Sequence, residues 1–175
     1  MLEIRKITLD SPDFAEIKRL YEDSFPSNER RAFEPLVTDA TGHAETLGFY
    51  DGGAFVGFAS LLLVGDIAHI IYFATEEKLR GRGCGSSALA AMHSRYDGRR
   101  VIVDVERERV GAENNEIRRR RRAFYLRNGY EPTRVRYNWR GDDYEILSHG
   151  GDVSGEEFGD FYRTLDNETE CLAEY

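Results

Sequence analysis

Three apolar runs in the first half of the chain are separated only by two short turns that contain glycine. The runs are Thr46–Tyr50, Ala54–Val64 and Ile67–Ala74, and the turns are Asp51-Gly52-Gly53 and Val64-Gly65-Asp66. Turns of this composition favour the tight reversals that join neighbouring antiparallel strands. This half of the chain therefore predicts a three-stranded antiparallel meander.

The segments on either side of the meander carry helix and strand signals in alternation. An edge strand is expected over 2–9, and a helix from Ser11-Pro12 to Ser24 with Ser11 as its N-cap. The remaining expected elements are a second helix with Asn28 as its N-cap that runs through 34–37, a helix that contains 89–96, a strand over 101–105, a helix from 114 or 115 to about 127, strands over 130–140 and 144–147, and a last helix from 154. The interpretation is an α+β fold. With no linker, repeat or low-complexity block, residues 1–175 are expected to form a single domain.

Composition narrows the class of protein. The chain is 41% hydrophobic and 32% charged, which is typical of a globular domain rather than a disordered one. No apolar run approaches the roughly 18 residues that span a bilayer, and the first residues do not resemble a secretion signal. We therefore expect a cytoplasmic protein with no membrane partner. The four histidines and two cysteines are scattered, so no metal site is expected.

Charge is distributed unevenly along the chain. The net charge is −8, which argues against a nucleic-acid partner. Residues 76–127, however, contain 14 basic and 8 acidic side chains, whereas the rest of the chain contains 10 basic and 24 acidic ones. A cationic segment suits a polyanionic ligand, and an acidic remainder suits a cationic one.

The cationic segment contains a glycine-rich loop, Leu79 to Leu89, between a strand and a helix. Glycines allow close approach of the backbone, and the free amides of a first helical turn bind phosphate. Gly83-x-Gly85-x-x-Ala88 also satisfies the dinucleotide fingerprint, but a polar stretch separates it from the preceding strand. A P-loop is excluded because no Gly-Lys-Ser/Thr is present. A plain structural turn is the remaining alternative.

Two motifs together resemble one family. Arg80-x-x-Gly83-x-Gly85, entered from Tyr72-Phe73-Ala74-Thr75, is similar to the acyl-CoA loop of the GNAT acetyltransferases. Residues 122–130, which contain Phe124-Tyr125 and end in Asn128-Gly129-Tyr130, are similar to a later motif of that family. The resemblance implies a mostly antiparallel sheet with one splayed parallel strand pair, flanked by helices. It also implies acetyl transfer from acetyl-CoA to a primary amine by direct attack in a ternary complex.

The resemblance implies a binding site for the co-substrate acetyl-CoA. The backbone at the end of the splayed strand would pair with pantetheine, and the loop would hold the pyrophosphate. The implied residues are Phe73, Ala74, Thr75, Arg80, Gly81, Arg82, Gly83, Cys84, Gly85 and Ser86. The family often has an asparagine seven residues before the tyrosine, where this chain has Arg118, so Asn115 is our candidate for that contact.

The resemblance also implies catalytic residues. Tyr125 occupies the position of the general acid that protonates the departing thiolate, although a packing role is the alternative. Glu106, at the end of the strand VIVDVE, is a candidate base for the acceptor amine; an orienting or merely exposed carboxylate is equally compatible with its position, and water is an alternative base. Arg121 is expected to be partly buried and paired with an unidentified carboxylate.

The acceptor side is expected to be built from residues 24–34 and the last hairpin. The acceptor would be a small-molecule amine or a peptide, cationic in view of the acidic remainder of the chain. We expect a monomer or a homodimer. A non-catalytic acyl-CoA-binding sensor or partner module is the alternative function.

Overall fold

The computed structural model describes residues 2–79 and 81–169. In chain order its elements are β1 (Glu3–Lys6), α1 (Phe14–Ser24), α2 (Glu34–Thr38), β2 (Ala44–Asp51), β3 (Ala54–Val64), β4 (Ile67–Thr75), the 3-10 helix η1 (Glu77–Leu79), α3 (Cys84–Arg95), β5 (Arg100–Glu106), α4 (Asn115–Arg127), β6 (Glu131–Trp139), β7 (Asp142–His149) and α5 (Gly155–Glu168). The α+β fold class expected from the sequence is confirmed.

The strands form one sheet in the order β1-β2-β3-β4-β5-β7-β6. The predicted meander is confirmed as β2, β3 and β4, which pair antiparallel. Among the described strands, β4 and β5 are the sole parallel pair. A dinucleotide-binding fold needs a largely parallel sheet, so the fingerprint at Gly83 has another explanation.

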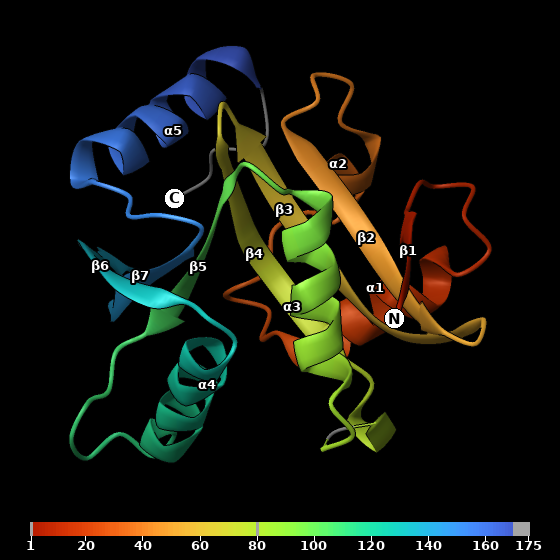
Figure 1. Cartoon of the computed structure of the whole chain (residues 1–175), viewed down its shortest axis with the longest axis horizontal. Helices are drawn as coiled ribbons and strands as arrows, with labels where there is room; N and C mark the ends of the chain where they lie inside the picture. The colour runs from red at the N-terminus through yellow and green to blue at the C-terminus, as the bar shows by residue number, and fades with distance from the viewer. Residues whose placement is uncertain (1, 80, 170–175) are drawn as a thin grey trace.

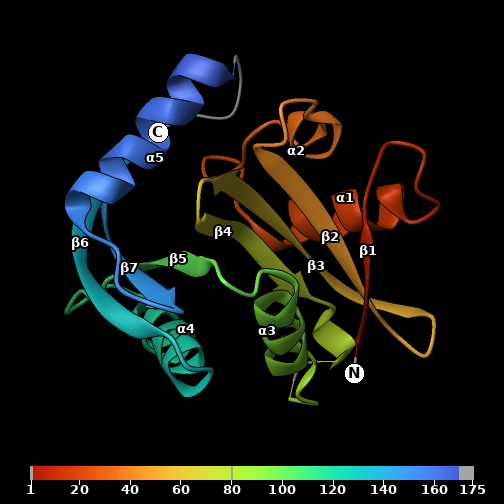
Figure 2. The same cartoon turned by 45° about the horizontal axis from the view of Figure 1, so that its top comes forward.

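Helices cover both faces of the sheet. Apolar side chains of α1, α2 and α5 pack with Phe58, Leu62 and Ile102 on one face. Side chains of α3 and α4 pack with Leu61, Ile70 and Val103 on the other. Figures 1 and 2 show α3 and α4 on the same side, and β4 and β5 adjacent at one end and diverging toward the other. In the described part of the chain, no helix is long and apolar enough to cross a membrane.

Local signals set most element boundaries, but the predicted starts of α1 and α2 are wrong; the N-cap of α2 is Phe33 and not Asn28. The predicted capping box at α5 is confirmed, since Ser154 and Glu157 bond reciprocally to each other's backbone amides. The prediction for α1 is wrong. Its N-cap is Asp13, because the Ser11 hydroxyl accepts a hydrogen bond from the Thr8 amide at 2.9 Å and its carbonyl closes a turn to Phe14.

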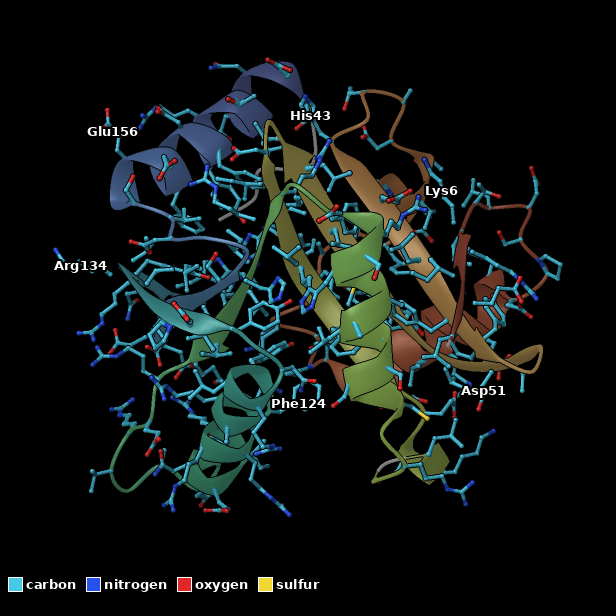
Figure 3. The ribbon with its side chains drawn as sticks, viewed as in Figure 1. Lys6, His43, Asp51, Phe124, Arg134 and Glu156 are labelled. Carbon is cyan, nitrogen blue, oxygen red and sulfur yellow. The ribbon has the colours of Figure 1, made fainter. Side chains whose placement is uncertain are left out.

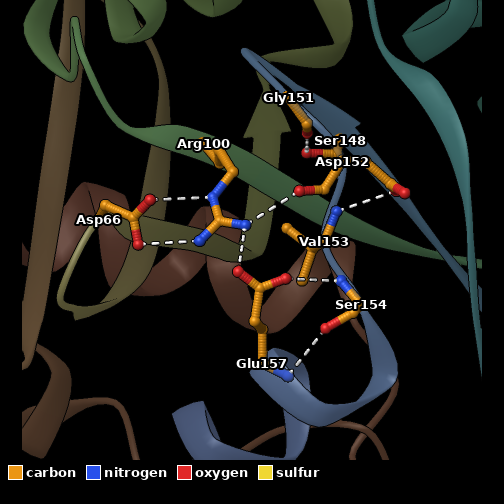
Figure 4. Close-up of polar contacts among 8 residues, drawn as sticks. All are labelled: Asp66, Arg100, Ser148, Gly151, Asp152, Val153, Ser154 and Glu157. Carbon is orange, nitrogen blue, oxygen red and sulfur yellow. Dashed lines mark hydrogen bonds and ion pairs between the residues drawn. The ribbon is translucent and has the colours of Figure 1, made fainter.

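Arg100, the first residue of β5, joins three distant segments (Figure 4). Its guanidinium bonds Asp66 in the β3–β4 turn at 2.9 and 3.0 Å, the Asp152 carbonyl at 2.9 Å and the Glu157 carboxylate at 2.7 Å. The side chain of Arg100 is 17% exposed, so these bonds are partly shielded from water. They secure the N-terminus of α5 to the end of the sheet where β4 and β5 are still paired.

Glu157 gives this junction a dependence on pH. The Ser154 amide and the Arg100 guanidinium lower the pKa of Glu157 to about 2 from the ordinary 4.5. Because the folded-state pKa is depressed, the stabilisation is present above pH 4.5 and is lost as the pH falls toward 2. We expect Glu157→Gln to lower the free energy of unfolding at pH 7, with a difference from the wild type that shrinks below pH 4.5.

Denaturant unfolding between pH 7 and 3 measures this difference. Glu156→Gln is the matched control, since Glu156 lies in the same first turn and points to solvent (Figure 3). A difference between wild type and Glu157→Gln that does not change with pH would contradict the assignment.

Candidate active site

The parallel pairing between β4 and β5 ends half-way along both strands. It joins Ile67–Ile70 to Arg100–Val103, whereas β4 continues to Thr75 and β5 to Glu106. Directly beyond the last pair, β4 has an extra residue, Ile71, opposite Ser60 and Leu61 of β3. A bulge increases strand twist and bends the strand away from its neighbour. The predicted splay is therefore present, and the inner edge of β4 beyond Ile70 is not paired with β5.

A pocket lies between this edge, the start of α3 and one side of α4. We call it the loop pocket; its lining residues are Ser24, Phe25, Phe73, Ala74, Thr75, Leu79, Gly81, Gly83, Cys84, Gly85, Ser86, Arg121, Phe124, Tyr125 and Arg127. Gly83 is the N-cap of α3 with φ of 81°, a left-handed conformation that favours glycine. No described side chain caps α3, so the amides of its first turn are available to an anion.

A second pocket lies where β4 and β5 separate, and we call it the aromatic pocket. Its lining residues are Phe25, Glu29, Arg31, Ile70, Ile71, Tyr72, Phe73, Val103, Asp104, Arg121, Tyr125, Trp139 and Tyr144. The segment before α2 is held there because the Tyr72 hydroxyl donates to the Glu29 carbonyl at 2.9 Å and accepts from the Arg31 amide at 3.0 Å. Residues from the segment 24–34 and from the β6–β7 hairpin thus line the same pocket.

Tyr125 lines both pockets, together with Phe25, Phe73 and Arg121. Its side chain is 5% exposed, and burial raises its pKa above the ordinary value, with a smaller opposing effect from Arg121. The phenol therefore keeps its proton at neutral pH. A protonated hydroxyl at the junction of two pockets is suited to donate a proton to a group that leaves one of them.

Glu106 is held by two arginines. Its Oε1 lies 3.1 Å from Nη2 of Arg118 and its Oε2 lies 3.5 Å from Nη1 of Arg121. Glu106 is therefore the carboxylate that pairs with Arg121. Glu106 is not among the described residues that line either pocket.

The structure brings most of the predicted co-substrate residues together. Phe73, Ala74, Thr75, Gly81 and the run 83–86 all line the loop pocket. Arg82 is not in its described lining, and Arg80 lies outside the described residues. Asn115 is turned elsewhere, since its Oδ1 accepts a hydrogen bond from the Arg109 amide at 2.8 Å.

Several lining residues were not predicted. Phe124 and Arg127 flank Tyr125 within the second motif, so that motif already contained a signal for them. Phe124 lies between α4 and α3 (Figure 3), and its ring would be 3.2 Å from a Cβ added at Gly85. Asp104, Trp139 and Tyr144 come from three separate strands, and only the fold places them at one pocket.

Gly57 on β3 lies directly against the backbone of β4 at residues 74–75, on the side of β4 that pairs with β3. A Cβ at this position would lie 2.4 Å from the Ala74 carbonyl oxygen, a backbone atom that has little room to move. We expect Gly57→Ala to shift residues 74–75, lower stability by about 1–2 kcal/mol and weaken CoA binding. Thermal unfolding and CoA titration measure both effects.

Gly155→Ala is the control, because a Cβ at Gly155 meets nothing within 4 Å. Equal behaviour of the two variants would show that the close approach at Gly57 is unimportant.

Comparison with known proteins identifies the family. The profile of the acetyltransferase (GNAT) domain matches residues 42–132, more than half of the chain. The chain therefore belongs to the GNAT acetyltransferase family, and it is an acetyl-CoA-dependent acyltransferase. No curated protein matches its sequence.

Solved structures of low sequence identity share the fold. A GNAT-family protein from Bacteroides thetaiotaomicron is 24% identical with a TM-score of 0.77, over 94% of this chain and 96% of that one. The ribosomal-protein-S18-alanine N-acetyltransferase from Escherichia coli is 18% identical with a TM-score of 0.60, over 89% and 97%. A GNAT family acetyltransferase from Elizabethkingia anophelis, solved with acetyl-CoA bound, is 14% identical with a TM-score of 0.55, over 85% and 97%.

Proposed function

We propose that residues 1–175 act as one N-acetyltransferase domain that moves an acetyl group from acetyl-CoA to the primary amine of a small-molecule or peptide acceptor. Transfer occurs by direct attack in a ternary complex. The observation that carries the proposal is the position of Tyr125, which lines both the loop pocket and the aromatic pocket. Two substrates bound on either side of the split would meet beside its hydroxyl.

The loop pocket is the proposed site of acetyl-CoA. The first-turn amides of α3 would bind the pyrophosphate, with Gly81, Gly83, Gly85 and Ser86 allowing or adding close contacts. The unpaired edge of β4 at 73–75 would hydrogen-bond the pantetheine arm as a neighbouring strand does. An amide of that edge aimed at the thioester carbonyl would stabilise the oxyanion, an effect typically worth about 3 kcal/mol.

The chemical step transfers the acetyl group from the sulfur of CoA to the nitrogen of the acceptor. The amine nitrogen attacks the thioester carbon, a C–N bond forms and the C–S bond breaks. An acceptor that binds as an ammonium ion first loses one proton to a base, so that its nitrogen has a free electron pair for the attack. Tyr125 donates its proton to the departing sulfur, and the nitrogen loses a second proton to a base once the C–N bond has formed. Glu106 is a candidate base that would act through water, because it is not among the described residues that line either pocket. Water acting without Glu106 is the other candidate.

A cationic acceptor is supported by the charges around the aromatic pocket. Four charged residues line it, the acidic Glu29 and Asp104 and the basic Arg31 and Arg121, and the Arg121 charge is paired with Glu106, which is outside the described lining. Burial raises the pKa of Tyr144, and the nearby carboxylates Glu29, Glu106 and Asp104 raise it further. Burial disfavours a charge of either sign, but the part of this rise that comes from the carboxylates reflects a negative potential, which favours an ammonium group.

Turnover across a panel of amines and peptides tests the function, with acetyl-CoA consumption followed as free thiol. We expect primary amines to be acetylated and cationic ones to lead. CoA binding without turnover of any amine would support the non-catalytic module instead. A clear preference for neutral or anionic amines would contradict the charge argument.

A further inference from the structure

His69 on β4 is a fully buried imidazole for which the proposed transfer step has no use. Its exposed fraction is 0%. Nδ1 lies 2.7 Å from the Tyr162 hydroxyl on α5, and Nε2 lies 2.8 Å from Oδ1 of Asp104 on β5. An ionised carboxylate only accepts hydrogen bonds, so Nε2 carries the hydrogen that is donated to Asp104. The two contacts fix the ring between a helix and a strand.

Asp104 is the first residue of β5 beyond its pairing with β4. His69 is opposite Ile102 in the parallel register, the last parallel pair is Ile70 with Val103, and Asp104 is the next residue of β5. Asp104 is one of the residues that line the aromatic pocket, and Tyr125 is another. The His69–Asp104 contact therefore connects the apolar core beneath α5 to a residue that lines the aromatic pocket.

The surroundings keep Asp104 ionised. Burial by itself would raise its pKa, but the hydrogen bond from His69 and the electrostatic effect of that ring, together with a hydrogen bond from Tyr137, bring the pKa below the ordinary value. A carboxylate with a lowered pKa is a weak base and a good partner for a cation.

We propose that Asp104 binds the ammonium group of the acceptor, and that His69 and Tyr162 are positioning residues that hold its carboxylate toward the aromatic pocket. This inference rests on the proposed function and narrows its substrate class. The pocket that contains Asp104 also presents Phe25, Trp139 and Tyr144. The acceptor is therefore a primary ammonium compound with an aromatic or apolar body.

Trp139 gives a readout that does not depend on turnover. It is the single tryptophan of the chain and it lines the aromatic pocket, so its fluorescence reports on what binds there. The probe is 2-phenylethylamine, titrated in the presence of CoA. Its neutral counterpart 2-phenylethanol has the same ring and chain length and lacks the charge.

The variant Asp104→Asn tests the anchor. We expect it to weaken 2-phenylethylamine binding at least about tenfold and to leave the weaker binding of 2-phenylethanol within about twofold. Asp97→Asn is the matched control, because Asp97 is exposed in the turn between α3 and β5. CoA affinity should be the same in all three proteins.

The variants His69→Leu and His69→Gln test the positioning role through pH. Loss of the donor in His69→Leu should raise the pKa of Asp104, so that probe affinity is lost at a higher pH than in the wild type. His69→Gln keeps an amide N–H donor and should restore much of the wild-type profile. The other ionisable groups near Asp104 or in the same pocket are all unchanged in these variants; they are Glu29, Arg31, Tyr72, Glu106, Arg121, Tyr125, Tyr137 and Tyr144.

The outcomes separate this inference from the proposed function. Unchanged probe affinity in Asp104→Asn, or a wild type that binds the amine no better than the alcohol, overturns the anchor whether or not turnover occurs. An Asp104-dependent affinity without acetylation of any amine would leave the anchor standing and overturn the transferase. If His69→Leu weakens binding equally at every pH, the role of His69 is structural only.

Discussion

Replacing Tyr125 with phenylalanine is expected to slow acetyl transfer at least about a hundredfold while leaving the affinity for CoA nearly unchanged. The substitution removes one oxygen from a 5% exposed ring that lines both pockets, so packing is conserved and only the proton donor is lost. Steady-state kinetics, with thiol release as the signal, and CoA titration measure the two effects separately.

Tyr130→Phe is a closely matched control. Tyr130 is also buried, its ring lies 5.3 Å from that of Tyr125, and its hydroxyl is 3.1 Å from Nε2 of His93 rather than at either pocket. We expect its turnover to stay within about threefold of the wild type. If Tyr125→Phe behaves like Tyr130→Phe, the thiolate receives its proton from another source and Tyr125 is a packing residue.

Replacing Arg118 with leucine is expected to lower the free energy of unfolding by about 2–3 kcal/mol. Arg118 is 6% exposed and bonds Asn114, the Arg107 carbonyl and Asp142, with Glu106 at 3.1 Å. Its loss leaves the carboxylates of Glu106 and Asp142 without this partner and frees the loop between β5 and α4. Denaturant unfolding monitored by circular dichroism measures the change.

The next residue of the same helix provides the comparison. The Arg119 side chain is 60% exposed, and its contacts with Glu108 and Glu116 are 3.9 and 3.8 Å long. Arg119→Leu should change stability by no more than about 0.5 kcal/mol. Similar losses in both variants would mean that the Arg118 contacts contribute little.

Arg118 also illustrates what sequence reasoning could and could not predict about the site. Five consecutive arginines, 118–122, occupy more than one helical turn, so their side chains cannot all face one ligand. The structure separates them: Arg118 pairs with Glu106 and Asp142, Arg121 pairs with Glu106 and lines both pockets, and Arg122 bonds Glu145 at 2.7 Å. These partners lie on β5 and β7, at separations of 12 to 24 residues that no local pattern reports.

The sequence by itself determined the elements whose causes are local. Glycine turns set the meander, a glycine loop set the start of α3, and Ser154 with Glu157 set the start of α5. Short-range hydrogen bonding and backbone conformation decide such features, so neighbouring residues suffice to predict them. The two motifs also predicted the family, and the second motif singled out Tyr125.

The tertiary structure alone decided which of two acidic residues of β5 lines the aromatic pocket. Asp104 and Glu106 are two residues apart on β5, and the alternation of a strand puts both on one face. Only the fold shows that Arg118 and Arg121 hold Glu106, whereas His69 and the opening of the sheet present Asp104 to the aromatic pocket. The physical reason is that charge pairing and burial depend on which distant elements meet, and a bulge at Ile71 decides where they part.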